Sequence, residues 1–123
     1  MNRNEYNGWT NFETWLANIW ITNDEGTTQF IQEQLDDLVE IAVMQDRDDS
    51  EIVEVVAEML EQVIEEIVLT DGVPSASLTS DLLNSAINEI NARELAHAFI
   101  EWGTVEEKRA EQAELEIIHI HQI

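Results

Sequence analysis

The stretch EIVEVVAEMLEQVIEEIVL, from Glu51 to Leu69, decides the fold class of this chain. Its apolar residues recur at intervals of three and four, which is the spacing of one helix face. They are Ile52, Val55, Val56, Met59, Leu60, Val63, Ile64 and Ile67. Many are β-branched, but a two-residue alternation does not hold over this length. The stretch therefore predicts a long amphipathic helix with a broad apolar stripe, and Ser50 is its expected cap.

Helical spacing also predicts amphipathic helices on both sides of this stretch. The first follows Thr10 and the second begins at Thr27 or Thr28. After the stretch, one helix covers Ser80 to Glu89, the next follows Asn91, and the last covers Val105 to Ile117. The expected inward residues are Phe30, Ile31, Leu35, Leu38, Ala42 and Val43 in the second helix, and Leu82, Leu83, Ala86, Ile87 and Ile90 in the fourth. The clearest break is the segment from Thr70 to Ser77, which contains Asp71-Gly72 and Pro74.

Three predicted helix starts carry a capping-box pattern, in which two side chains bond each other's free backbone N–H groups. The pairs are Thr10 with Glu13, Asn91 with Glu94, and Thr104 with Glu107. We therefore expect an all-α fold: one compact domain of residues 1–123 with five or six helices. Residues 1–7 are expected to be loose. The tail 118–123 is ambiguous, because its alternation also suits a short strand.

Acidity dominates the composition: 27 acidic residues stand against five basic ones, for a formal net charge of −22. Such a chain repels anionic lipid and nucleic acid, so its physical complement is a basic partner. The N-terminus lacks an apolar signal region, and no apolar run approaches the ~20 residues needed to span a bilayer. We expect a protein of the cytoplasm, with no membrane association.

The acidic residues form rows on two predicted helices. Glu51, Glu54, Glu58, Glu61 and Glu65 are three or four residues apart, so they lie along one helix face for about 21 Å. Asp36, Asp37 and Glu40 lie on the second helix. A plain solvated face is the simplest interpretation, but such faces usually interleave lysines, which relieve the repulsion. The unrelieved row favours a functional surface.

Trp9, Trp15 and Trp20 cluster near the start of the chain. We expect them to anchor the first helix on the core. As an alternative, one or two of them form a partner hot spot or a dimer seam, where tryptophan is enriched. The breadth of the third helix's apolar stripe leaves room for a homodimer.

Catalytic and metal sites have weak support in the sequence. There is no cysteine, no nucleophile motif and no glycine-rich phosphate loop. His119 and His121 would suit a metal only on a strand and with a third ligand. We therefore assign no enzyme activity, no metal and no cofactor.

Two segments carry a resemblance to a family. YNGWTNFETWLANIWITNDEG, Tyr6 to Gly26, resembles the signature YNGWxNYETWxxxLWxxNDEG of small acidic proteins of phages, plasmids and other mobile elements. SDLLNSAINEIN from Ser80, followed by RELA from Arg93, is similar to that family's DLLNxALxEVNxxEIA segment. Phe12 replaces the usual Tyr, and Ala92 stands where Trp is frequent. The resemblance covers about a third of the chain and implies a mobile-element origin but no particular activity.

Very acidic helical phage proteins resemble the DNA mimics that block restriction enzymes and CRISPR effectors, which is an analogy of class only. We expect a counter-defence inhibitor that occupies the nucleic-acid-binding groove of a basic host defence protein. The row from Glu51 to Glu65 would carry the phosphate-like charge. The alternative is a non-enzymatic adaptor or regulator that binds through an aromatic patch, with the charge serving solubility.

Overall fold

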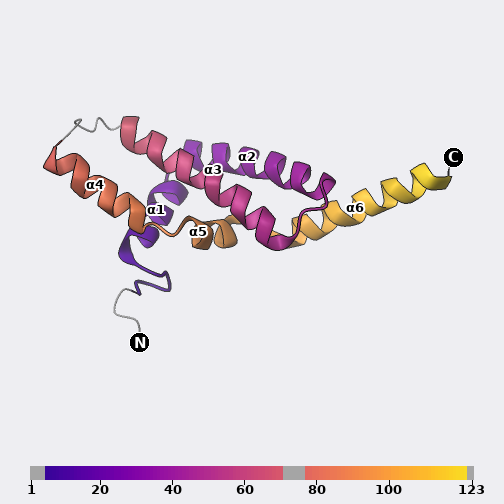
Figure 1. The fold of residues 1–123 in the computed structure, drawn as a ribbon, viewed down its shortest axis with the longest axis horizontal. Helices are drawn as coiled ribbons and strands as arrows, with labels where there is room; N and C mark the ends of the chain where they lie inside the picture. The colour runs from indigo at the N-terminus through magenta and orange to yellow at the C-terminus, as the bar shows by residue number, and fades with distance from the viewer. Residues whose placement is uncertain (1–4, 71–76, 122–123) are drawn as a thin grey trace.

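The computed structural model describes residues 5–70 and 77–121, and these fold into six α-helices (Figure 1). The helices are α1 (Phe12–Asn23), α2 (Glu25–Met44), α3 (Asp49–Thr70), α4 (Leu78–Glu89), α5 (Ala92–Phe99) and α6 (Trp102–His121). The all-α prediction is confirmed.

The long helix α3 is the centre of the arrangement. It packs against α2, to which a short loop joins it, and against α5 on another side. The helix α1 packs against α2, α4 and α5, while α6 packs against α2. Figure 1 shows α6 extending past the other helices to the C-terminus. All residues of α6 from Ala113 to His121 are exposed.

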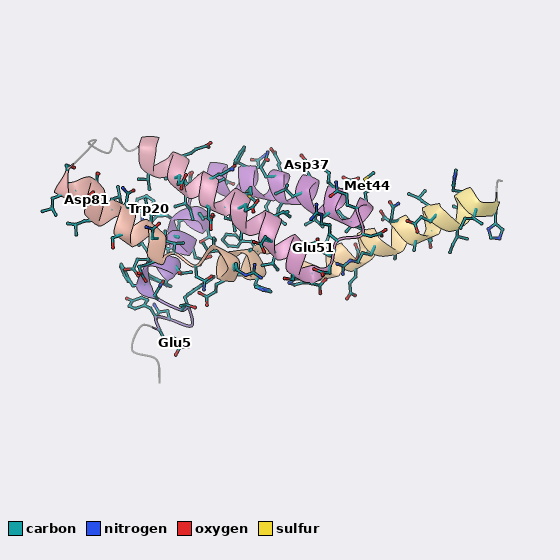
Figure 2. All side chains as sticks on the ribbon, in the orientation of Figure 1. Glu5, Trp20, Asp37, Met44, Glu51 and Asp81 are labelled. Carbon is teal, nitrogen blue, oxygen red and sulfur yellow. The ribbon has the colours of Figure 1, made fainter. Side chains whose placement is uncertain are left out.

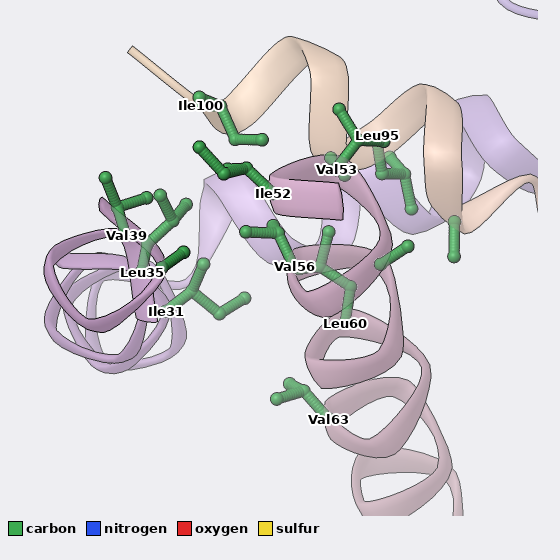
Figure 3. Packing of buried hydrophobic residues seen from close by; sticks show 14 of the residues in the cluster. Ile31, Leu35, Val39, Ile52, Val53, Val56, Leu60, Val63, Leu95 and Ile100 are labelled. Atoms are coloured by element: carbon green, nitrogen blue, oxygen red, sulfur yellow. The ribbon is translucent and has the colours of Figure 1, made fainter. Parts of the chain in front are cut away.

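The core forms where α2, α3 and α5 meet (Figure 3). Ile52, Val56 and Leu60 of α3 are completely buried, as the helical spacing predicted. Val53 and Ala57 are buried too, because α5 covers a flank of α3 that the predicted stripe left out. The other buried apolar residues are Ile21, Ile31, Leu35, Val39, Ala42, Val43, Val63, Ile64, Ala92, Leu95, Ala96, Ile100 and Val105.

Two predicted inward residues are instead exposed. Leu82 of α4 is 62% exposed, and Phe30 of α2 is 45% exposed. No residue of α4 is buried; Leu83 and Ile87 are half-buried. Its inward face is therefore narrower than predicted. The predicted break around Pro74 falls largely on residues 71–76, outside the described residues.

The first two helices begin at other residues than predicted. The N-cap of α1 is Asn11, whose Oδ1 accepts a hydrogen bond from the Thr14 N–H at 2.9 Å. The predicted box of Thr10 with Glu13 is therefore wrong. Asp24 ends α1 and caps α2, which begins at Glu25 rather than at Thr27 or Thr28. One residue thus separates the two helices.

The start of α3 is a capping box that the sequence analysis missed. The Glu51 N–H donates to the Asp48 carboxylate at 2.8 Å, and the Asp48 N–H donates to the Glu51 carboxylate at 3.2 Å. Ser50 lies inside the helix, so its prediction as the cap is wrong. A left-handed residue, Asp46 with φ 55°, precedes this start and completes the turn from α2.

The start of α6 also differs, because the chain leaves α5 at Ile100 and re-enters a helix at Trp102. The N–H groups of Thr104 and Val105 both donate to the carbonyl of Glu101. Thr104 is therefore inside the first turn, and its predicted capping box is wrong. The helix continues to His121, so the described part of the tail is helical rather than extended.

Tyr6 and Asn7, expected in a loose segment, belong to a tight turn. Asn7 and Gly8 both have positive φ, 47° and 88°, as a type I′ turn requires. The backbones of Tyr6 and Trp9 exchange two hydrogen bonds across it. The Tyr6 ring lies 5.2 Å from Phe12 and 4.8 Å from Trp15, measured between centroids, so the turn packs onto α1.

Candidate functional site

A hydrogen-bond network around one buried side chain joins the start of α1 to the start of α5. Its centre is Thr14, which is completely buried. The Thr14 hydroxyl donates to Asn11 Oδ1 at 2.6 Å and accepts the backbone N–H of Asn91 at 2.9 Å. The Asn11 side-chain amide donates to the carbonyl of Glu89 at 2.7 Å. Thr14 therefore ties the two helix starts together.

The carboxylate of Glu94 extends this network. Its two oxygens accept the backbone N–H of Thr10 at 3.0 and 3.1 Å. The prediction for Asn91 is confirmed in one half: its side chain accepts the Glu94 N–H at 3.0 Å, but Glu94 does not bond back to Asn91 in the predicted way. The polar residues of the two quoted segments thus hold the fold together.

A comparison with protein families finds one that matches most of the chain. A family described as "Family of unknown function (DUF7249)" matches residues 2–101. The chain belongs to this family. The matched region contains both quoted segments and the Thr14 network, and it ends immediately before α6. No curated protein and no solved structure matches the chain. The mobile-element origin remains a prediction.

The acidic row on α3 is exposed along its whole length, from Glu51 to Glu65. Its first two members have partners: Glu51 pairs with Arg47 and Glu54 with Arg93, each at 3.1 Å. Sequence spacing predicted a row without nearby cations. The pair of Glu54 with Arg93 could not be seen from spacing, because Arg93 lies on α5, 39 residues further along the chain.

Glu58, Glu61 and Glu65 form the rest of the row, which we call the free acidic row. All three are exposed, and within residues 5–70 and 77–121 none of them has an ion pair or a hydrogen bond from its side chain. The opposite face of α3 is packed into the core. The free acidic row is therefore held on a fixed helix face.

Asp36, Asp37 and Glu40 are exposed on α2 as predicted. The ammonium of Lys108 donates to the backbone carbonyl of Asp36 at 3.1 Å, which places this residue beside α6. Glu54, by contrast, borders α5 through Arg93. Asp36 and Glu54 thus border different helices, and Figure 2 shows Asp37 and Glu51 apart on the ribbon.

The tryptophans divide into two groups. Trp9 is half-buried against the core, and Trp15 is half-buried, with its ring centroid 5.7 Å from that of Phe12. Trp9 thus packs against the core, whereas the ring contacts of Trp15 are with Tyr6 and Phe12. Trp20 is 69% exposed, and Figure 2 shows its position near α4. Of the three predicted residues, Trp20 alone offers most of its side chain to a partner.

A groove of about 870 Å³ lies beside Trp20. It is formed by α1, the start of α2, the C-terminal half of α3, and α4. Its lining is mainly apolar and includes Leu16, Phe30, Ile67 and Leu83. The sequence analysis missed this groove, because it depends on how α4 is placed relative to α3. The only sequence signal was the set of apolar residues from Leu82 to Ile90, which were all expected to face the core.

The two histidines of the tail lie on the last turn of α6, where side chains two residues apart do not face each other. His121 Nδ1 lies 2.9 Å from the carbonyl of Ile117. In the described part of the chain, no three potential ligands gather into a metal site. None of its helices is long and apolar enough to cross a membrane.

Proposed function

We propose that this protein binds a basic, nucleic-acid-binding protein through the acidic face of α3 and so prevents nucleic acid from binding. The observation that carries the proposal is the free acidic row, Glu58, Glu61 and Glu65, exposed on a helix whose other face is buried. Because the row is already fixed, it loses little conformational entropy on binding, whereas a flexible acidic segment would lose more.

The charge spacing supports mimicry of a nucleic-acid strand. The three glutamates of the free acidic row, from Glu58 to Glu65, extend over about 10 Å, or about one charge per 5 Å. One DNA strand carries about one charge per 3.4 Å. The net charge of −22 adds a long-range field of the same sign. When lysines and arginines of a DNA-binding groove bind this acidic surface, they would displace its counterions, as they displace those of DNA.

The kind of target follows from the resemblance to proteins of mobile elements. Such elements gain from blocking restriction enzymes or CRISPR effectors, whose grooves bind DNA. We therefore propose a counter-defence inhibitor that acts in the bacterial cytoplasm by occupancy, without catalysis. This step rests on the resemblance and on analogy of class.

A second candidate function is that of an adaptor or regulator that binds through an apolar surface. The observation in its favour is the exposure of Trp20, at 69%, beside Leu16 and Phe30, at 36% and 45%. Exposed aromatic residues at the edge of a groove are typical anchors of protein interfaces. In this case the acidic surface serves solubility.

Neutralising the free acidic row distinguishes the two candidates. The variant is Glu58→Gln, Glu61→Gln, Glu65→Gln, which leaves the two ion-paired glutamates unchanged. The matched control makes the same three changes at Glu111, Glu114 and Glu116, exposed residues of α6. Both variants have the same net charge. Each is immobilised beside the unaltered protein, exposed to a bacterial lysate at low salt, and eluted with high salt.

We expect DNA-binding proteins to be captured by the unaltered protein and by the α6 control, and lost by the α3 variant. Elution by salt is expected because the contact is between charges. Equal capture by all three proteins would show that the free acidic row is not the contact surface. Capture of the same protein at high salt would favour the second candidate.

A further inference from the structure

The groove beside Trp20 has apolar walls from helices that lie far apart in the sequence. Val63 and Ile67 come from α3, Leu83 and Ile87 from α4, and Trp20 from α1. Leu83, Ile87 and Ile67 are each only half-buried. The inward face of α4 therefore stays partly open to the groove.

The size of the groove suits a helix. Its lining residues on α4 and at the C-cap of that helix, from Leu83 to Ile90, extend over about 11 Å, which corresponds to about two helical turns. In helix-in-groove recognition, a partner helix inserts apolar side chains spaced at i, i+3 or i+4, and i+7. Trp20, which is 69% exposed, and Phe30, which is 45% exposed, stand at this groove as contact residues for such a helix.

Charge decides what kind of helix fits. Among the described residues, three acidic ones, Glu13, Asp24 and Glu66, line the groove, and no Lys, Arg or His does. A helix that flanks its apolar face with lysine or arginine would be attracted by these carboxylates. The exposed apolar end of α6 in a second copy brings Glu114 and Glu116, on a chain of charge −22, so like charges oppose that occupant.

We infer that this groove binds a basic amphipathic helix of a partner protein. The inference does not depend on the free acidic row, because Glu58, Glu61 and Glu65 do not line the groove. It gives the second candidate function a partner chemistry. If the protein instead acts as a DNA mimic, the groove would supply a separate apolar contact to the same basic target.

The test uses a labelled synthetic peptide of about 14 residues, long enough for about 21 Å of helix. It contains leucine at helical spacing and lysine at most other positions. A scrambled peptide of the same composition has the same charge but no apolar face. Binding to the whole 123-residue chain is measured by fluorescence anisotropy at physiological salt. The variants are Trp20→Ala and Phe30→Ala, with Met44→Ala as the control, because Met44 is 61% exposed and does not line the groove.

We expect the amphipathic peptide to bind at least about tenfold more tightly than the scrambled one, and Trp20→Ala to reduce its affinity about tenfold or more. Phe30→Ala should weaken binding in the same direction, and Met44→Ala should leave it unchanged. None of the three side chains is buried in the core, so circular dichroism should show unchanged helix content.

Equal affinity of the two peptides would show attraction by charge alone and would overturn the inference. So would unchanged affinity in both Trp20→Ala and Phe30→Ala. Self-association of the protein that disappears in Trp20→Ala would assign the groove to a second copy instead. The variant Glu58→Gln, Glu61→Gln, Glu65→Gln should retain the preference for the amphipathic peptide. This separates failure of the groove from failure of the acidic row.

Discussion

Replacing Thr14 with valine tests the network that joins α1 to α5. Valine has nearly the same shape as threonine but lacks the hydroxyl, so the change removes the 2.6 Å bond to Asn11 and the acceptor of the Asn91 N–H. An unpaired buried donor costs about 1–3 kcal/mol and a lost hydrogen bond about 1 kcal/mol. The added methyl group returns about 0.8 kcal/mol. We expect a net loss of about 2 kcal/mol in the free energy of unfolding.

Thr14→Ser is the matched control, because it keeps the hydroxyl and loses only a methyl group, worth about 1 kcal/mol. Both variants are unfolded with urea and followed by circular dichroism. Heating the same variants gives a second measurement, in which each kcal/mol corresponds to about 4 °C in Tm for a chain of this size. The reasoning predicts that Thr14→Val is the less stable variant. A Thr14→Val protein as stable as Thr14→Ser, or more stable, would refute the role of the hydroxyl.

Two further predictions concern the core and the junction of α1 with α2, both measured by urea unfolding. Leu95→Ala, at a completely buried residue, should reduce the free energy of unfolding by about 2–5 kcal/mol. Leu82→Ala, at a residue that is 62% exposed, should change it by less than about 0.5 kcal/mol. A large effect at Leu82 would contradict the placement of α4. Asp24→Ala should cost about 1 kcal/mol, because the carboxylate accepts the Thr27 N–H at the start of α2, and a neutral result would mean that water replaces this cap.

Helical spacing predicted α3 and the fully buried Ile52, Val56 and Leu60, because burial on a helix face leaves a repeating pattern in the sequence. Helix starts were harder. Thr10 and Asn11 can both cap a helix, and the pairing of Thr10 with Glu13 three residues later favoured Thr10 in the sequence. In the structure Asn11 caps the helix, and the Thr10 N–H is bound instead by the carboxylate of Glu94, 84 residues away.

In the candidate surfaces, too, local spacing predicts some features, whereas others depend on the packing of distant segments. The exposure of Glu58, Glu61 and Glu65 could be predicted, because they lie opposite the apolar stripe. The partnership of Glu54 with Arg93 could not, because it depends on the packing of α5 against α3. The groove beside Trp20 depends on the placement of four helices, so no single stretch of sequence indicates it.

The most direct test of the central claim is a competition experiment with the DNA-binding protein that the capture experiment identifies. This protein is first bound to a labelled DNA duplex, and increasing amounts of the acidic protein are added at several salt concentrations. The account predicts release of the DNA by the unaltered protein and by the α6 control, but not by the Glu58→Gln, Glu61→Gln, Glu65→Gln variant. Inhibitory strength should fall steeply with salt. A complex that holds the DNA and the acidic protein at the same time would contradict it.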